Sequence, residues 1–146
     1  MVKRMFLAIV VALLTCVGAM AQSAGDQILG TYKVIRNGQE SKVKVFKKDN
    51  GYRAQVIWLK EPNNPDGTPK RDVRNSDKAK RNVLSSEIVL IDKVIYKDGV
   101  WCDGRIYDPT KGKTFNVEMK FQDAKTLKVK GNWGPFSDTS TWTKLD

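Results

Sequence analysis

The sequence predicts an all-β domain in which about eight antiparallel strands follow one another up and down and close into a barrel. First, apolar and polar residues alternate along most of the chain after residue 25, and no stretch keeps a helical period for long. Second, turn-forming pairs such as Asn37-Gly38 and Asp98-Gly99 separate the alternating segments at hairpin spacing. Third, an open meander leaves two unpaired edge strands, and closure removes both edges.

The first segment departs from this pattern and predicts a secretory signal peptide over residues 1–21. Two basic residues precede an apolar run over 5–14, and Ala19 and Ala21 match the small residues before a signal-peptidase cleavage site. A transmembrane anchor is the alternative, but spanning a bilayer takes about 20 apolar residues. Lipidation at Cys16 is a second alternative, which the preceding threonine disfavours. We therefore expect a periplasmic or secreted protein.

Cleavage leaves residues 22–146 as a single domain whose one cysteine is Cys102, so no internal disulfide is expected. The formal net charge is +10, and loss of the two basic residues of the signal peptide brings it to +8 (10 − 2). The basic residues are spread over many segments, and export argues against a nucleic-acid partner. They favour solubility, with peripheral contact to an anionic envelope surface as the alternative.

Eight segments carry the strand pattern, at about 30–36, 41–48, 51–59, 86–95, 100–107, 113–121, 125–132 and 139–145. The segment 113–121 shows it most clearly, because its apolar residues all fall on one face: Phe115, Val117, Met119 and Phe121. Short turns join most neighbours. An eight-stranded barrel has an interior that side chains fill, or that holds one small ligand.

The connection over 60–82 is much longer than the others, with three prolines and no strand pattern. Loops of this length in compact domains are usually functional or disordered. We expect either a lid or rim at one end of the barrel, or a solvated excursion. Within it, 76–82 is expected to form one short helical turn with Ser76 as its cap.

The segment 103–115 combines turn residues with an unusually polar strand. Asp108 and Gly112 explain a tight turn without any function. On a regular strand, Asp103, Arg105 and Tyr107 would share a face with Trp101. Such a face is too polar for a plain core, so it either faces water or forms a hydrogen-bonded network inside the barrel.

Several kinds of chemistry are excluded by composition. The chain has no histidine, which excludes Ser-His-Asp catalysis and histidine-ligated zinc. No glycine-rich phosphate motif is present, and we expect neither a cofactor nor a metal. A hydrolase that uses Asp103, Asp108 or Glu118 as acid or base remains an alternative to a non-enzymatic protein.

Four stretches resemble one known family: 70–75, 98–121, 127–134 and 141–144. Together they are similar to DUF2147, a family of uncharacterised exported bacterial proteins, most specifically at "IYDPTKGK" from Ile106 to Lys113. This resemblance implies a small exported β-barrel and no established activity. In addition, the opening Gly30-Thr31-Tyr32 and the late Lys144 resemble lipocalin-type barrels, in which a late basic residue packs over a ring on the first strand.

The leading functional hypothesis is a non-enzymatic binding protein. It would hold a small or lipid-like ligand, with an anionic head group as one option, at the barrel mouth under the 60–82 loop. A filled barrel that serves the envelope as a structural or protein-interaction module is the alternative. The candidate ligand-binding residues are Trp58, Asn64, Asp72, Asn75, Arg81, Trp101, Arg105, Tyr107, Asp108 and Lys113.

Overall fold

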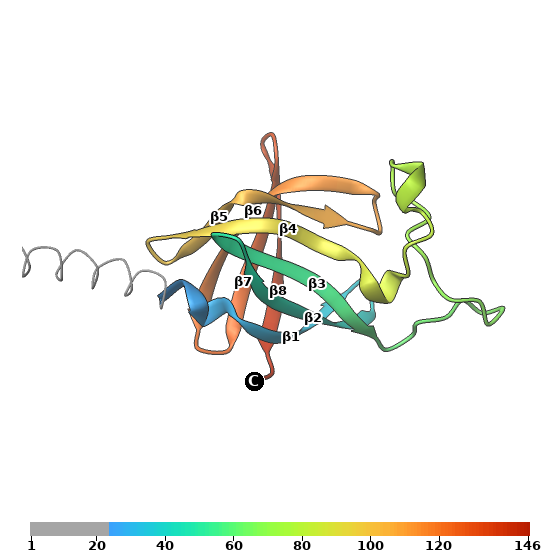
Figure 1. The fold of residues 1–146 in the computed structure, drawn as a ribbon, viewed down its shortest axis with the longest axis horizontal. Helices are drawn as coiled ribbons and strands as arrows, with labels where there is room; N and C mark the ends of the chain where they lie inside the picture. The colour runs from blue at the N-terminus through green and yellow to red at the C-terminus, as the bar shows by residue number, and fades with distance from the viewer. Residues whose placement is uncertain (1–23) are drawn as a thin grey trace, which may run out of the picture.

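The computed structural model describes residues 24–146, so the predicted signal peptide and Cys16 lie outside the described residues. Eight antiparallel strands form a closed barrel in the order β1 to β8, with β8 paired to β1 (Figure 1). Their bounds are β1 Gly30–Arg36, β2 Gln39–Lys48, β3 Gly51–Leu59, β4 Val89–Lys97, β5 Val100–Asp108, β6 Lys113–Asp123, β7 Thr126–Trp133 and β8 Phe136–Lys144. The predicted fold class is therefore confirmed.

Residues 24–146 also contain three short 3-10 helices: η1 Asp26–Ile28, η2 Lys78–Lys80 and η3 Ser85–Glu87. β4 begins at Val89 and not near 86, because η3 occupies the preceding residues. The predicted turn in the long loop exists as η2, but its cap is Asp77 and not Ser76. The Asp77 carboxylate accepts a hydrogen bond from the Ala79 amide at 3.0 Å.

The seam between β1 and β8 closes the barrel. Tyr32 pairs with Lys144 and Val34 with Trp142, and the rings of Tyr32 and Trp142 lie 6.1 Å apart. The Lys144 ammonium lies over the ring of Phe121 and donates to the Gln27 carbonyl at 2.6 Å. Lys144 therefore pairs with Tyr32 in strand register, as the lipocalin resemblance implies, but its ammonium group packs over Phe121 of β6 and not over the first-strand ring.

The segment around η1 plugs one end of the barrel, which we call the closed end. The Trp101 indole N–H donates to the Gly25 carbonyl at 3.1 Å, and the Tyr32 hydroxyl donates to the Ile28 carbonyl at 2.7 Å. The Tyr52 hydroxyl donates to the Asp26 carboxylate at 2.7 Å. Because these groups are satisfied, the aromatic rings stay buried and this end of the interior is filled.

A bulge in β5 changes which side chains face the interior. Trp101 pairs with Met119, but the next pair joins Gly104 to Val117, so β5 has one residue more than its partner here. Asp103 takes this extra place with a φ of 57°. The backbone also passes close to β4 here, where a Cβ on Gly104 would meet the Lys93 carbonyl oxygen at 2.1 Å.

The bulge makes one sequence-based expectation wrong. Asp103, Arg105 and Tyr107 do not share a face with Trp101, because the extra residue reverses the alternation after it. Ile106 pairs with Ile91 and faces the interior, as does Asp108 at the end of the strand. Arg105 and Tyr107 belong to the opposite face, so the polar side chains are not a network inside the core.

At the other end, which we call the open end, lie the turns β1–β2, β5–β6 and β7–β8 and the long loop between β3 and β4 (Figure 1). In residues 24–146, no helix has the length and hydrophobicity needed to cross a bilayer.

Candidate ligand-binding cavity

A cavity of about 1040 Å³ occupies the open end of the barrel. Its walls are apolar where the strands converge, and they consist mainly of Val34, Leu90, Ile106, Phe115, Val129 and Trp142. Gly131 also lies in the wall, where the missing side chain leaves room. Polar residues gather towards the mouth, and the tip of the β7–β8 hairpin, with Trp133 and Phe136, forms one lip.

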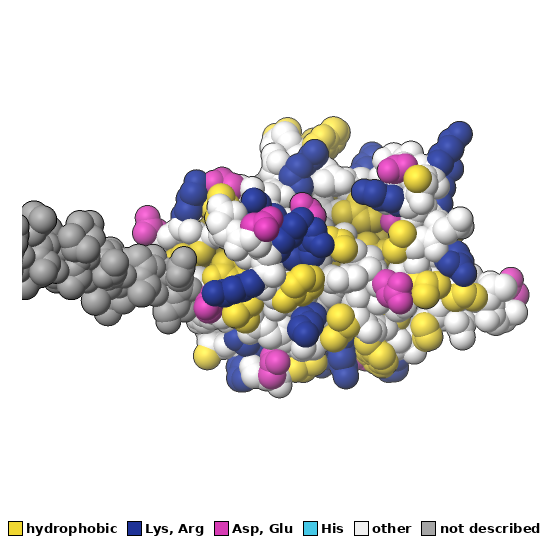
Figure 2. All heavy atoms as spheres, in the orientation of Figure 1, with side chains coloured by type: hydrophobic (Ala, Val, Ile, Leu, Met, Phe, Trp, Pro, Cys, Tyr) yellow, Lys and Arg dark blue, Asp and Glu magenta, His cyan; other side chains and the backbone are white. Residues whose placement is uncertain are grey.

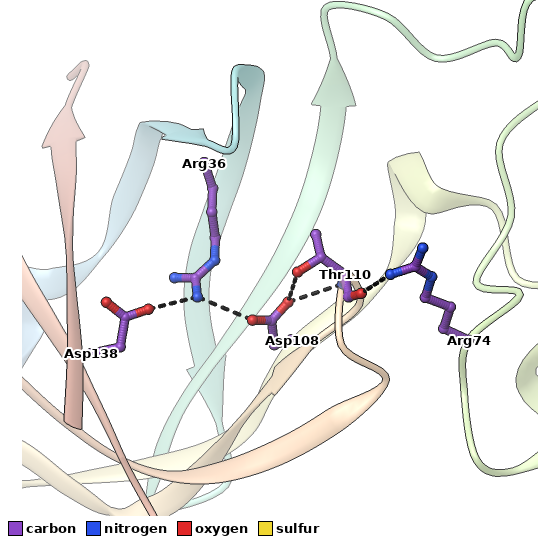
Figure 3. A network of polar contacts seen from close by, with 5 residues as sticks. All are labelled: Arg36, Arg74, Asp108, Thr110 and Asp138. Carbon is purple, nitrogen blue, oxygen red and sulfur yellow. Dashed lines mark hydrogen bonds and ion pairs between the residues drawn. The ribbon is translucent and has the colours of Figure 1, made fainter. Parts of the chain in front are cut away.

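One arginine spans the mouth between two carboxylates (Figure 3). A single Arg36 nitrogen, Nη2, lies 3.0 Å from Asp108 Oδ2 and 2.8 Å from Asp138 Oδ2. The three residues come from the open ends of β1, β5 and β8, so they tie together strands that are far apart in sequence. The Arg36 Nε is buried and has no hydrogen-bond partner among the described residues.

Asp108 has a second role, because it also builds the β5–β6 turn. Its Oδ1 accepts hydrogen bonds from the amide and the hydroxyl of Thr110, at 2.9 and 2.6 Å. Its carbonyl accepts from the Gly112 amide at 2.8 Å. Burial by itself raises the pKa of Asp108, but the Thr110 hydrogen bonds and the charge of Arg36 outweigh it and hold the pKa below its ordinary value.

Replacing Asp108 with asparagine should lower the free energy of unfolding by about 1–3 kcal/mol at neutral pH, since charged hydrogen bonds of a nearly buried group are lost. Because folding lowers the pKa, this stabilisation is present above the pKa of the unfolded carboxyl, about 3.9, and is lost as the pH falls through the folded value. Urea denaturation from pH 7 down to pH 2 checks this.

The matched control is Asp138→Asn, which removes the more exposed carboxylate on the same arginine and should cost less than about 1 kcal/mol. A wild-type advantage over Asp108→Asn that stays constant to the acid end would contradict the assignment.

The long loop is fastened to the outer side of β5 by a buried carboxylate. Asp72 is 4% exposed, accepts a hydrogen bond from the Tyr107 hydroxyl at 2.7 Å, and accepts another from the Asn75 side chain at 2.9 Å. Arg81 supports Asn75 by donating from Nε to its carbonyl at 2.7 Å. Four polar residues noted in the sequence therefore form one connected network at the foot of the loop.

A second contact joins the loop to the β5–β6 turn. Arg74 donates to the Thr110 carbonyl (Figure 3). Gly112 has a φ of 65°, and a Cβ there would lie 2.0 Å from the Arg74 carbonyl oxygen. Only glycine allows both the turn and this approach. The contact places Ser76 in the cavity wall, so the loop forms part of the rim.

Replacing Tyr107 with phenylalanine should loosen the loop while keeping the barrel. The change removes one hydrogen bond from the Asp72 carboxylate and leaves it partly unsatisfied, a cost of about 1–3 kcal/mol. We expect faster amide hydrogen exchange over residues 70–84 and unchanged exchange in β7. As a control, Tyr96→Phe alters a tyrosine at the closed end and should leave the loop unchanged. Equal exchange in the loop of both variants would contradict the fastening role.

The candidate residues from the sequence occupy three different places. Asp108 and Lys113 line the cavity, while Arg105 and Tyr107, on the outer face of β5, border its rim. Asp72, Asn75 and Arg81 form the network behind the rim, and Asn64 lies farther out in a turn of its own with Thr68. Two tryptophans lie elsewhere: Trp58 is half-exposed beneath the Lys42 ammonium, and Trp101 is core at the closed end.

Sequence reasoning missed Arg36, Asp138 and the aromatic pair at the β7–β8 tip. Alternation offered a signal for β8, because steps of two residues back from Trp142 reach Ser140, Asp138 and Phe136 on the inner face. Arg36 follows Val34 by the same rule. The predicted first strand, 30–36, includes Arg36, whereas the predicted last strand, 139–145, begins after Asp138 and Phe136.

The carboxylates of the hydrolase hypothesis do not meet. Asp103 lies in the bulge and pairs with Lys97 in solvent, and Glu118 is exposed opposite Lys130. Only Asp108 reaches the cavity, and its pKa is lowered, whereas a general acid at neutral pH needs a raised one. Cys102 is half-buried and unpaired among the described residues, and burial raises its thiol pKa.

Comparison with known proteins identifies the family. A family model described as "Uncharacterized protein conserved in bacteria (DUF2147)" matches residues 30–144. The chain belongs to the DUF2147 family. This DUF2147 chain is also similar to a solved structure, protein HP1028 from the human pathogen Helicobacter pylori, which is described as belonging to the lipocalin family. The TM-score is 0.66 with 24% identity, over 82% of this chain and 83% of that one. The fold of this DUF2147 protein is thus lipocalin-like. None of the curated proteins is significantly similar to it.

Proposed function

We propose that this protein binds one small amphiphilic molecule, with the apolar part in the barrel cavity and the polar end at the mouth. The observation that carries the proposal is a cavity of about 1040 Å³ with apolar walls and a charged rim. Sites for small molecules have this form: a concave apolar pocket with a few polar groups that fix the orientation of the ligand. A lipid-like molecule has the matching shape and polarity.

The charges at the mouth favour an anionic head group. Arg36 is already balanced by Asp108 and Asp138, so it organises the rim and is not a free positive charge. Lys111 and Lys113 also line the cavity, and neither is within ion-pair distance of a carboxylate in the described part of the chain. These two ammonium groups are available to an incoming anion.

The same observations weigh on the alternatives. A structural module with a filled barrel needs no cavity of this size. The three carboxylates considered for a hydrolase do not face one cavity, because Asp103 and Glu118 lie away from the one that Asp108 lines. Export, proposed from the signal-peptide pattern over 1–21, would place the protein in the periplasm or outside the cell, where lipid-like molecules need a carrier in water.

Displacement of a fluorescent fatty acid by three ten-carbon compounds tests the proposal. Decanoate, decanol and decyltrimethylammonium share one chain and differ in head-group charge. All three should compete, with decanoate the tightest and the ammonium the weakest. Failure of the fluorescent fatty acid to bind would refute a lipid-like ligand, and an equal affinity for all three would refute the anionic head group.

A further inference from the structure

The tip of the β7–β8 hairpin exposes two aromatic rings that do not belong to the hydrophobic core. Trp133 and Phe136 are 65% and 66% exposed, and their rings stack at 6.2 Å with an interplanar angle of 20°. The hairpin stands out from the barrel in Figure 1, and hydrophobic atoms cover its tip in Figure 2. Exposed apolar groups gathered at a protruding point commonly mark a contact with a partner.

The tip is held in a fixed shape. The strands pair without interruption from Thr126–Thr143 to Trp133–Phe136, and only Gly134 and Pro135 form the turn. Gly134 has a φ of 55°, and the ring of Pro135 fixes the φ of that residue. The two rings are therefore presented together at little cost in conformational entropy when they enter a partner.

Positive charge surrounds the same mouth. Among the residues that line the cavity or border its rim, four are basic and two are acidic, which gives a net charge of +2 (4 − 2). The basic residues are Arg36, Arg105, Lys111 and Lys113, and the acidic ones are Asp108 and Asp138. The formal charge of the whole chain, +10, has the same sign. A partner for this rim is expected to be anionic.

We propose that the open end docks on an anionic lipid surface, with Trp133 and Phe136 inserted at the level of the head groups and the rim lysines above lipid phosphates. Aromatic rings settle at membrane–water interfaces, and basic residues add attraction to anionic lipids. Two rings are too small an area for a stable protein interface, which takes about 1,000 Å² or more. This docking turns the cavity mouth towards the bilayer, and it does not depend on the identity of the cavity ligand.

Sedimentation with vesicles tests the docking. The purified protein is mixed with vesicles of phosphatidylcholine, or of phosphatidylcholine with one quarter phosphatidylglycerol. We expect binding to the anionic vesicles only, weakened about ten-fold or more by Trp133→Ser with Phe136→Ser, and similarly by Lys111→Ala with Lys113→Ala. Trp133→Phe should abolish most of the blue shift in tryptophan emission that accompanies binding.

Matched controls alter the closed end. Leu145→Ser removes an exposed apolar residue there, and Lys120→Ala with Lys125→Ala removes the same charge as the rim variant, so both should bind as the wild type does. Absence of binding to anionic vesicles, or binding that the tip variant does not weaken, would overturn the proposal. So would a wild-type dimer that the tip variant converts to a monomer, since the rings would then cover a second copy.

The two proposals fail separately. Fatty-acid binding is measured without vesicles, and vesicle binding without fatty acid. A protein that binds the fatty acid and ignores both vesicles has a ligand cavity but no membrane contact.

Discussion

Replacing Trp101 with alanine is expected to lower the free energy of unfolding by about 3–5 kcal/mol, as for other buried aromatic residues. The ring is 1% exposed, packs on Tyr96 and Phe121 with centroids 4.9 and 5.6 Å away, and donates to the Gly25 carbonyl. Its loss would open a void under η1 and leave that carbonyl unsatisfied. Because a whole domain is stabilised by only about 5–15 kcal/mol, a shift of this size is easily seen in urea denaturation.

Trp133→Ala is the matched control, because it removes the same side chain from an exposed tip and should change stability by less than about 0.5 kcal/mol. The loss in free energy of unfolding for Trp101→Phe should lie between those of the two alanine variants, since phenylalanine keeps much of the packing and loses the hydrogen bond. A Trp101→Ala variant as stable as Trp133→Ala would contradict the description of η1 and Trp101 as the plug of the barrel.

Replacing Gly131 with phenylalanine is expected to weaken binding of the fluorescent fatty acid at least about ten-fold, the equivalent of roughly 1.4 kcal/mol. Gly131 pairs with Val117 and Asp138 in the cavity wall. A Cβ there would meet Phe115 and Ile106 at 3.5 and 3.7 Å, which are ordinary contacts, so the backbone accepts a side chain. A phenyl ring at this place would project into space that the ligand chain needs.

Gly131→Ala is the control for the backbone change, because one methyl group fits without displacing its neighbours and leaves most of the cavity open. We expect near wild-type affinity for this variant and normal thermal unfolding for both. Equal affinity of the alanine and phenylalanine variants would show that the fatty acid binds somewhere else.

The barrel fold could be predicted from the sequence because the alternation of apolar residues and the turn-forming residues are local signals that agree with each other. In 113–121 one face is wholly apolar, and Asn37-Gly38 and Asp98-Gly99 supply the positive φ values that tight hairpins need. Closure followed from the cost of unpaired edges, and the structure pairs β1 with β8 as that reasoning requires.

The candidate site could be predicted only in part, because it depends on where the alternation breaks and on which distant strands meet. The bulge at Asp103 reverses the faces of Arg105 and Tyr107. Its signal in the sequence is a glycine inside a strand after an aspartate that tolerates positive φ, and this signal does not fix which residue is the extra one. The bridge from Arg36 to Asp108 and Asp138 joins three strands across the mouth of the barrel. Such a contact depends on closure and register together, which local patterns do not specify.

Nuclear Overhauser effects between decanoate and protein methyl groups show directly whether a ligand chain lies inside the barrel. We expect contacts from the decanoate chain to the methyl groups of Leu90, Ile106 and Val129, which line the cavity, and none to the exposed methyl groups of Ile57. Contacts to Ile57 and none to the cavity methyl groups would contradict the account, because the molecule would then bind the outer surface of the barrel.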